Sequence, residues 1–131
     1  MRTFLFAAAF GMIASPVFAN DVFGVWKSEP SDEGAYIHVK IGPCESDAAK
    51  VCGKIIETFN GTGERDIVGR LIIENMEPDG ENEWDNGTIW APDDDETYSS
   101  EMELKNKNTL EVSGCVLGGI ICRGQDWTRV K

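Results

Sequence analysis

The feature that most restricts the fold of this chain is a period-two alternation of apolar and polar residues in short segments. Residues 35–41 place apolar side chains at the odd positions and polar ones at the even positions, and residues 96–104 and 109–116 alternate similarly. Such alternation is typical of strands with one packed face and one solvated face. Turn sequences rich in Gly, Pro, Asn and Asp separate the segments, and no segment carries an apolar stripe at helical spacing.

Evenly spaced short strands joined by tight turns predict an all-β antiparallel meander of about eight strands. Closing eight strands into a small barrel pairs the edge strands and leaves an interior wide enough for side chains or one small ligand. A two-sheet sandwich is the alternative, and we favour the barrel. The expected strands span residues 22–27, 35–41, 51–58, 68–76, 82–90, 96–104, 109–116 and 119–130.

Residues 1–19 have the features of a secretory signal peptide. Arg2 gives a positive start, residues 4–14 form an apolar run, and Val17-Phe18-Ala19 is a small-x-small cleavage site. The run is shorter than the ~20 apolar residues of a membrane-spanning helix. No cysteine follows the cleavage site, which argues against a lipoprotein. We therefore expect a single domain over residues 20–131, exported to the periplasm without a membrane anchor.

The acidic composition limits the partners. The chain carries 23 Asp+Glu against 12 Lys+Arg, a formal charge of −11, which becomes −12 when Arg2 is removed with the leader. An acidic surface cannot neutralise phosphates, so nucleic acid and anionic membrane surfaces are excluded as partners. A basic protein, such as an enzyme that the domain inhibits, is a favourable partner, because the negative electrostatic field of the domain raises the rate of association.

Four cysteines, Cys44, Cys52, Cys115 and Cys122, are placed by export where disulfides persist. They allow three pairings, and sequence alone does not choose between them. Local pairing is the simplest, because hairpin partners already lie at roughly the 5.5–6 Å Cα separation of a disulfide. We expect the disulfides Cys44–Cys52 and Cys115–Cys122. A metal or redox site is less favoured, since the spacings are not C-x-x-C and His38 is the only histidine.

Catalytic residues are difficult to identify. His38 lies on the polar face of its segment, where we expect a surface residue, and no free thiol remains if both disulfides form. The carboxylates are numerous enough to be neighbours by chance, and none lies in an acid/base motif. We expect a non-enzymatic protein with no catalytic residues and no cofactor, and a hydrolase is the remaining alternative.

Two acidic segments offer oxygen ligands of the kind that Ca²⁺ prefers. They are Asp93-Asp94-Asp95-Glu96 and Asp79-Gly80-Glu81-Asn82-Glu83. Neither has the spacing of a calcium-binding EF-hand loop. We favour solvated acidic turns and predict no metal site.

The inward face of the expected barrel forms either a filled core or an apolar cavity, and the sequence leaves both possible. Trp84 and Trp90 flank the Asp85-Asn86-Gly87 turn and either line the mouth or cover the strand ends. We predict that a small apolar or amphipathic molecule binds inside. The candidate ligand contacts are Ile37, Val39, Ile55, Ile73, Tyr98, Met102, Leu104 and Val112, and Leu71 and Leu110 are assigned to the same inward face.

Several motifs follow one another in the order of a known family. They are Gly24-Val25-Trp26, Cys52-Gly53-Lys54-Ile55, Trp84 to Pro92, Thr97-Tyr98-Ser99, Leu110 to Cys115, and Cys122 to Val130. The chain resembles the bacterial exported family catalogued as domain of unknown function 2147 over essentially all of residues 20–131. The resemblance implies a lipocalin-like, eight-stranded barrel and no settled activity.

The chain departs from the pattern of that family at two places. Val68-Gly69 stands where the family usually has a second Cys-Gly, and Asp95-Glu96 stands where it tends to have a Gly before the Thr-Tyr. Lipocalins place a Gly-x-Trp on the first strand and an Arg from the last strand across it. The resemblance therefore implies that Gly24, Trp26 and Arg129 close one end of the barrel, with the guanidinium over the indole.

Overall fold

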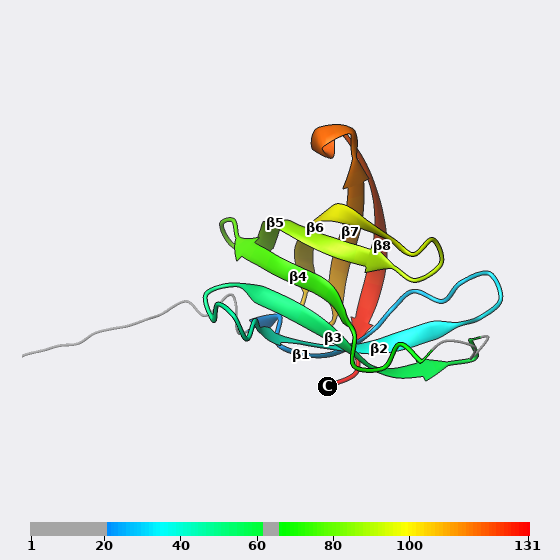
Figure 1. The fold of residues 1–131 in the computed structure, drawn as a ribbon. Coiled ribbons are helices and arrows are strands. Elements are labelled where there is room, and N and C mark those ends of the chain that lie inside the picture. The colour runs from blue at the N-terminus through cyan, green and yellow to red at the C-terminus, as the bar shows by residue number, and fades with distance from the viewer. Residues whose placement is uncertain (1–20, 62–65) are drawn as a thin grey trace, which may run out of the picture.

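The computed structural model describes residues 21–61 and 66–131, so the expected signal peptide lies outside the described residues. Eight strands form a closed antiparallel barrel in meander order, as Figure 1 shows, which confirms the predicted fold. One 3-10 turn, η1 (Leu117–Gly119), separates the last two strands. The strands are β1 (Gly24–Lys27), β2 (Tyr36–Pro43), β3 (Val51–Phe59), β4 (Leu71–Pro78), β5 (Glu83–Ala91), β6 (Glu96–Asn106), β7 (Thr109–Val116) and β8 (Ile121–Arg129).

Irregular positions bend β4 and β5 around the barrel. Asn75 and Asn86 adopt positive φ angles of 59° and 61°, which asparagine tolerates better than most residues. Gly87 is buried beside them, and a Cβ atom there would collide with the Met76 sulfur and lie 2.6 Å from the Glu74 carbonyl oxygen. Glycine is therefore required at this corner for close packing rather than for its φ angle.

The barrel interior is a packed hydrophobic core over most of its length. Trp26, Trp84 and Trp127 are almost completely buried, and aliphatic side chains from β2 to β7 fill the space between them. The assignment of Leu71 to the inward face is wrong, because its side chain is 39 % exposed. The ladder between β3 and β4 is irregular at Gly53 and Lys54, so the alternation shifts there and the consecutive Ile72 and Ile73 are both buried.

The barrel closes where β1 pairs with β8, with Trp26 opposite Arg129. The Arg129 guanidinium carbon lies 4.4 Å from the centroid of the Trp26 ring. Gly24 has a φ of 142°, and a Cβ atom there would lie 2.7 Å from the Arg129 Nη1 atom. The glycine of the Gly-x-Trp motif thus leaves room for the guanidinium.

The arginine also binds the backbone around it. Its Nε donates to the Lys107 carbonyl at 2.7 Å, Nη1 to the Phe23 carbonyl at 3.0 Å, and Nη2 to the Asp21 carbonyl at 2.6 Å. One side chain therefore joins the segment before β1 to the β6–β7 turn and to β8.

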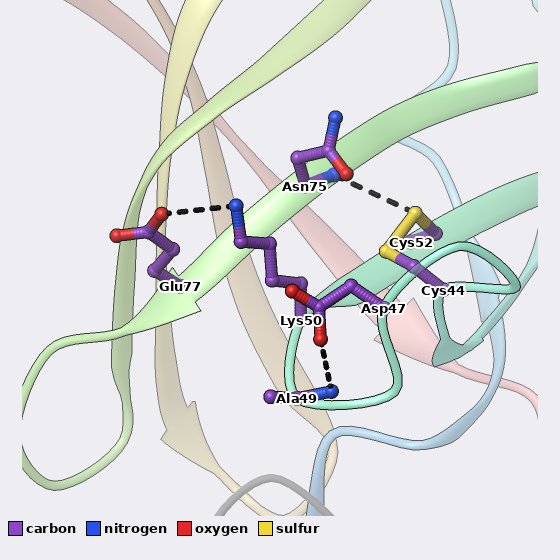
Figure 2. The surroundings of a disulfide bond; sticks show 7 residues. All are labelled: Cys44, Asp47, Ala49, Lys50, Cys52, Asn75 and Glu77. Carbon is purple, nitrogen blue, oxygen red and sulfur yellow. Dashed lines mark hydrogen bonds and ion pairs between the residues drawn. A yellow bond between two sulfur atoms is a disulfide. The ribbon is translucent and has the colours of Figure 1, made fainter.

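Both predicted disulfides are confirmed. The Cys44–Cys52 bond closes the loop between β2 and β3, and Figure 2 shows its surroundings. The backbone amide of Asn75 donates to the Cys52 sulfur at 3.5 Å, and Lys50 forms an ion pair with Glu77 at 3.3 Å. These contacts attach the loop to β4, and the hydrogen bond from Asn86 together with the Lys50 ion pair lowers the pKa of Glu77.

The second disulfide, Cys115–Cys122, joins the facing ends of β7 and β8 immediately before and after the connection between them. This hairpin extends beyond the rest of the barrel in Figure 1, where it is coloured orange. The disulfide therefore clamps the base of a projecting turn.

Candidate functional site

A cavity of about 1060 Å³ opens at one end of the barrel. Its wall draws on the connections that follow β1, β3 and β5 and on the facing ends of β7 and β8, so these segments surround the mouth. The volume slightly exceeds the usual range for small-molecule sites, roughly 300–1,000 Å³. The packed core borders this cavity, because Ile72, Trp90, Val112 and Trp127 belong to the core and also line the cavity.

The deeper wall of the cavity is apolar and aromatic. Its side chains come from the seven strands β2 to β8 and from three connections, and they include the rings of five aromatic residues. A wall of this kind suits the apolar part of a small-molecule ligand, and a few polar groups in such a site orient the polar end of the ligand. The apolar and aromatic lining residues are Ala35, Tyr36, Ile37, Phe59, Ile67, Ile72, Ile89, Trp90, Ala91, Pro92, Tyr98, Val112, Val116, Ile121 and Trp127.

Trp90 is held by contacts on its face and its edge. The Arg70 guanidinium carbon lies 3.5 Å from the ring centroid, and the indole Nε1 donates to Asp95 at 3.0 Å. Stacking of a guanidinium on an indole is favourable because the cation faces the negative side of the ring. The ring is therefore fixed in the cavity wall before any ligand enters.

Tyr98 is fixed in a similar way on the neighbouring strand. Its hydroxyl donates to an Asp94 carboxylate oxygen at 2.8 Å. This hydrogen bond is the main reason that the pKa of Tyr98 is raised, because ionised Tyr98 would lose the donor and face a carboxylate. Two carboxylates of the acidic β5–β6 turn thus position aromatic residues of the mouth.

Strand β8 contributes a polar row to the wall. Arg123, Gln125 and Trp127 alternate along the strand and all line the cavity. The Trp127 Nε1 donates to the Gln125 side-chain oxygen at 2.8 Å, so this amide is oriented. Gly114 lies opposite Arg123 in the ladder, and its missing side chain leaves space in the wall.

Three of the eight candidate ligand contacts from the sequence line the cavity: Ile37, Tyr98 and Val112. The other five are buried in the core and do not line it: Val39, Ile55, Ile73, Met102 and Leu104. The alternation assigned these residues to the inner face, but it carries no information on the depth at which side chains stop filling the barrel.

Sequence analysis did not single out Arg123 or Gln125. The alternation along residues 121–129 contained the signal, because Trp127 and Arg129 share a face and the same parity continues to these two residues. Both tryptophans near the Asp-Asn-Gly turn are buried in the core, and of the two only Trp90 also lines the cavity. His38 is half-buried beside the rings of Tyr36 and Phe59.

A second feature is a row of acidic residues across the outer face of β5 to β8. Glu83 pairs with Glu103, Glu103 with Glu111, and Glu111 with Asp126. We call these four residues the acidic ladder. Lys105 forms an ion pair with Asp126 at 3.3 Å, and this contact raises the pKa of Lys105.

Asp85 lies near the acidic ladder and shows the effect of crowded carboxylates. Its pKa is raised, first by burial and then by the neighbouring Asp79. Both causes disfavour the charged form of Asp85.

The family model described as "Uncharacterized protein conserved in bacteria (DUF2147)" matches residues 24–129. The chain belongs to this family. The resemblance seen in the sequence motifs is thereby confirmed, and the closing pair Trp26 and Arg129 lies within the matched range of this DUF2147 barrel.

Among solved structures, the barrel is similar to a Helicobacter pylori protein described as "Protein HP1028 from the human pathogen Helicobacter pylori belongs to the lipocalin family". The match has a TM-score of 0.67 at 13% identity and covers 84% of this chain and 83% of that one. At this identity the likeness shows a shared lipocalin fold. No curated protein matches the sequence. Within residues 21–61 and 66–131, no helix is long and apolar enough to cross a bilayer.

Proposed function

We propose that this DUF2147 barrel is an exported, periplasmic binding protein that holds a small apolar or amphipathic molecule in the cavity. The cavity itself carries the proposal, because it is large, open at one end and lined by fixed aromatic and aliphatic side chains. The features of residues 1–19 and the two disulfides support export to an oxidising compartment.

The proposed role requires no chemical step. The fixed Trp90 and Tyr98 rings would contact the apolar body of the ligand, and the polar groups of Arg123 and Gln125 would face its polar end. Because Trp90, Tyr98 and Gln125 are already held by hydrogen bonds, binding would order few side chains, so less of the interaction energy would be lost to conformational entropy.

The neutral fluorophore N-phenyl-1-naphthylamine tests the proposal by fluorescence titration. We expect binding to the wild-type protein, and we expect Gly114→Phe to weaken it at least tenfold, because a ring at position 114 would fill the cavity. Ile56→Phe is the matched control, since Ile56 is exposed and does not line the cavity. Equal affinity in all three proteins would contradict the proposal.

Native mass spectrometry of protein purified from its own compartment gives a second test. We expect a co-purifying mass that is absent from Gly114→Phe. Failure of the wild-type protein to bind the fluorophore, together with the absence of any co-purified mass, would refute ligand binding in the cavity.

The acidic ladder favours a second candidate function, a module that binds a basic protein partner. The two functions differ in their dependence on ionic strength. Binding of an apolar ligand would change little between low and high salt, whereas an electrostatic complex would weaken steeply as the Debye length shortens.

A further inference from the structure

The turn between β7 and β8 exposes four large aliphatic side chains in one place. Leu117 is 68% and Ile120 82% exposed, and Val116 and Ile121 beside them are 42% and 55% exposed. We call residues 116–121 the hairpin tip. Single exposed aliphatic residues are normal on protein surfaces, but a contiguous group usually marks an interaction site.

The hairpin tip is also held in a defined shape. The Cys115–Cys122 disulfide clamps its base, and Leu117, Gly118 and Gly119 all have positive φ angles. A positive φ is unfavourable for a leucine, so the surrounding structure imposes this conformation. The clamped turn therefore keeps the Leu117 and Ile120 side chains in solvent.

The charge distribution around the tip restricts its partner. The stretch from Ser113 to Gln125 contains no Asp or Glu, although the chain has 23 of them, and Arg123 is its one charged residue. Asp126 follows this stretch directly and Glu111 precedes it with one residue between, and the Glu101 carboxylate lies within 4.8 Å of the disulfide sulfurs at the base of the tip. Residues 116–121 of the hairpin tip are apolar and uncharged, whereas the protein as a whole is acidic. We therefore expect the tip to bind an apolar surface that carries little net charge.

The tip is continuous with the cavity. Val116 and Ile121 are part of the tip and also line the cavity wall. The hairpin tip therefore adjoins the mouth of the cavity, which the acidic β1–β2 and β5–β6 connections also border.

We propose that the hairpin tip docks the protein onto a lipid bilayer of low net charge, with Leu117 and Ile120 inserted at the boundary between headgroups and acyl chains. Insertion of this kind depends on the buried apolar area and on the charge of the lipid. Anionic lipids weaken it, because the acidic body of the protein approaches the same surface. The docking goes beyond the proposed function, since it does not depend on which molecule occupies the cavity.

Co-sedimentation with vesicles of zwitterionic phosphatidylcholine tests the proposal. We expect the wild-type protein to bind, and the variant Leu117→Asn/Ile120→Asn to bind at least tenfold more weakly. Asparagine tolerates the positive φ at position 117, so this variant keeps the turn. Ile56→Ser/Val130→Ser is the matched control and retains wild-type binding, because both residues are exposed aliphatics outside the tip.

Two further measurements distinguish insertion of the tip into lipid from a general loss of folding or of ligand binding. Ile120→Trp should gain fluorescence that shifts to shorter wavelength on vesicle addition, and binding should fall when phosphatidylglycerol replaces part of the phosphatidylcholine. Leu117→Asn/Ile120→Asn should bind N-phenyl-1-naphthylamine as the wild-type protein does, so failure of docking and failure of ligand binding remain distinguishable.

Three outcomes would overturn the proposal. They are no binding of the wild-type protein to phosphatidylcholine vesicles, equal binding by the tip variant, and a concentration-dependent dimer in sedimentation velocity that the tip variant abolishes. The last result would assign the tip to a contact between two copies of the chain.

Discussion

Arg129 makes more contacts than any pattern in the sequence could indicate. Its guanidinium covers Trp26 and donates to three backbone carbonyls. A cation over an aromatic ring contributes about 0.5–2 kcal/mol and hydrogen bonds from a charged donor about 1.5–3 kcal/mol, less where solvent competes. The stability of the closed end therefore depends strongly on one side chain.

We expect Arg129→Ala to lower the free energy of unfolding by about 2 kcal/mol, measured by urea denaturation. Arg129→Lys should recover little of this loss. The planar guanidinium donates to three carbonyls in different directions, whereas the single ammonium of lysine cannot reach all three. Arg123→Ala is the control and should change stability by less than about 0.5 kcal/mol, since Arg123 is exposed at the mouth. Unchanged stability of Arg129→Ala would show that the closing contacts are energetically neutral.

Tyr98 gives the mouth a measurable pH signature. The hydrogen bond to Asp94 raises the pKa of Tyr98, so its stabilising contribution is complete below the ordinary tyrosine pKa of about 10 and is lost as the pH rises through the higher value in the folded protein. The chain has two tyrosines, so Tyr36→Phe leaves Tyr98 as the single phenol.

In the Tyr36→Phe background, we expect ultraviolet absorbance titration to show Tyr98 ionising at a higher pH than a free tyrosine. Adding Asp94→Asn should lower the pKa of Tyr98, because the amide carries no negative charge. Adding Asp93→Asn instead should leave it higher than in the Asp94 variant. The same titration curve with and without Asp94 would contradict the assignment of that hydrogen bond.

The acidic ladder has one carboxylate on each of the four strands β5 to β8. Like charges in directly opposite positions of a sheet destabilise it, by roughly 0.2–1 kcal/mol for each pair. Glu103 faces both Glu83 and Glu111, whereas Lys105 neutralises only Asp126 at the end of the row.

We expect Glu103→Gln to raise the free energy of unfolding by about 0.5–1 kcal/mol at low ionic strength, measured by thermal and urea denaturation. The gain should disappear in about 1 M salt, where the Debye length is about 3 Å. Glu57→Gln is the matched control, because Glu57 faces His38 rather than a carboxylate. A gain of the same size in that control would exclude repulsion within the ladder as the cause.

Elements with clear alternation were predicted well from the sequence. All eight strands appear, and both disulfides join residues that flank one turn, where local geometry decides the pairing. Leu71 was misassigned because the irregular pairing of Gly53 and Lys54 is a property of two strands together. A single strand does not display such an irregularity in its own sequence.

The candidate site was predicted only in part. The period-two alternation identified Ile37, Tyr98 and Val112 as inward-facing residues that line the cavity. It missed Arg123 and Gln125, because polar residues in a strand are expected to face solvent. Whether an inward residue meets a cavity or a filled core depends on side chains from all eight strands. Burial depth therefore emerges only once the barrel is assembled.

At the scale of the whole molecule, the polar and apolar surfaces are divided between regions. The acidic ladder covers the outside of β5 to β8, while the hairpin tip projects from the last two of these strands without any carboxylate. Two different surfaces are thus available at once, one for charged species and one for apolar species.

The joining of the first and last strands has a consequence for biosynthesis. The Val25 amide donates to the Lys131 carbonyl at 2.7 Å, and the Val130 amide donates to the Val25 carbonyl at 2.7 Å, so β1 lacks one neighbour until the final residues are present. A nascent chain halted before residue 121 would expose two unpaired edges, which invite aggregation and proteolysis. The ring can therefore close only after β8 has been synthesised.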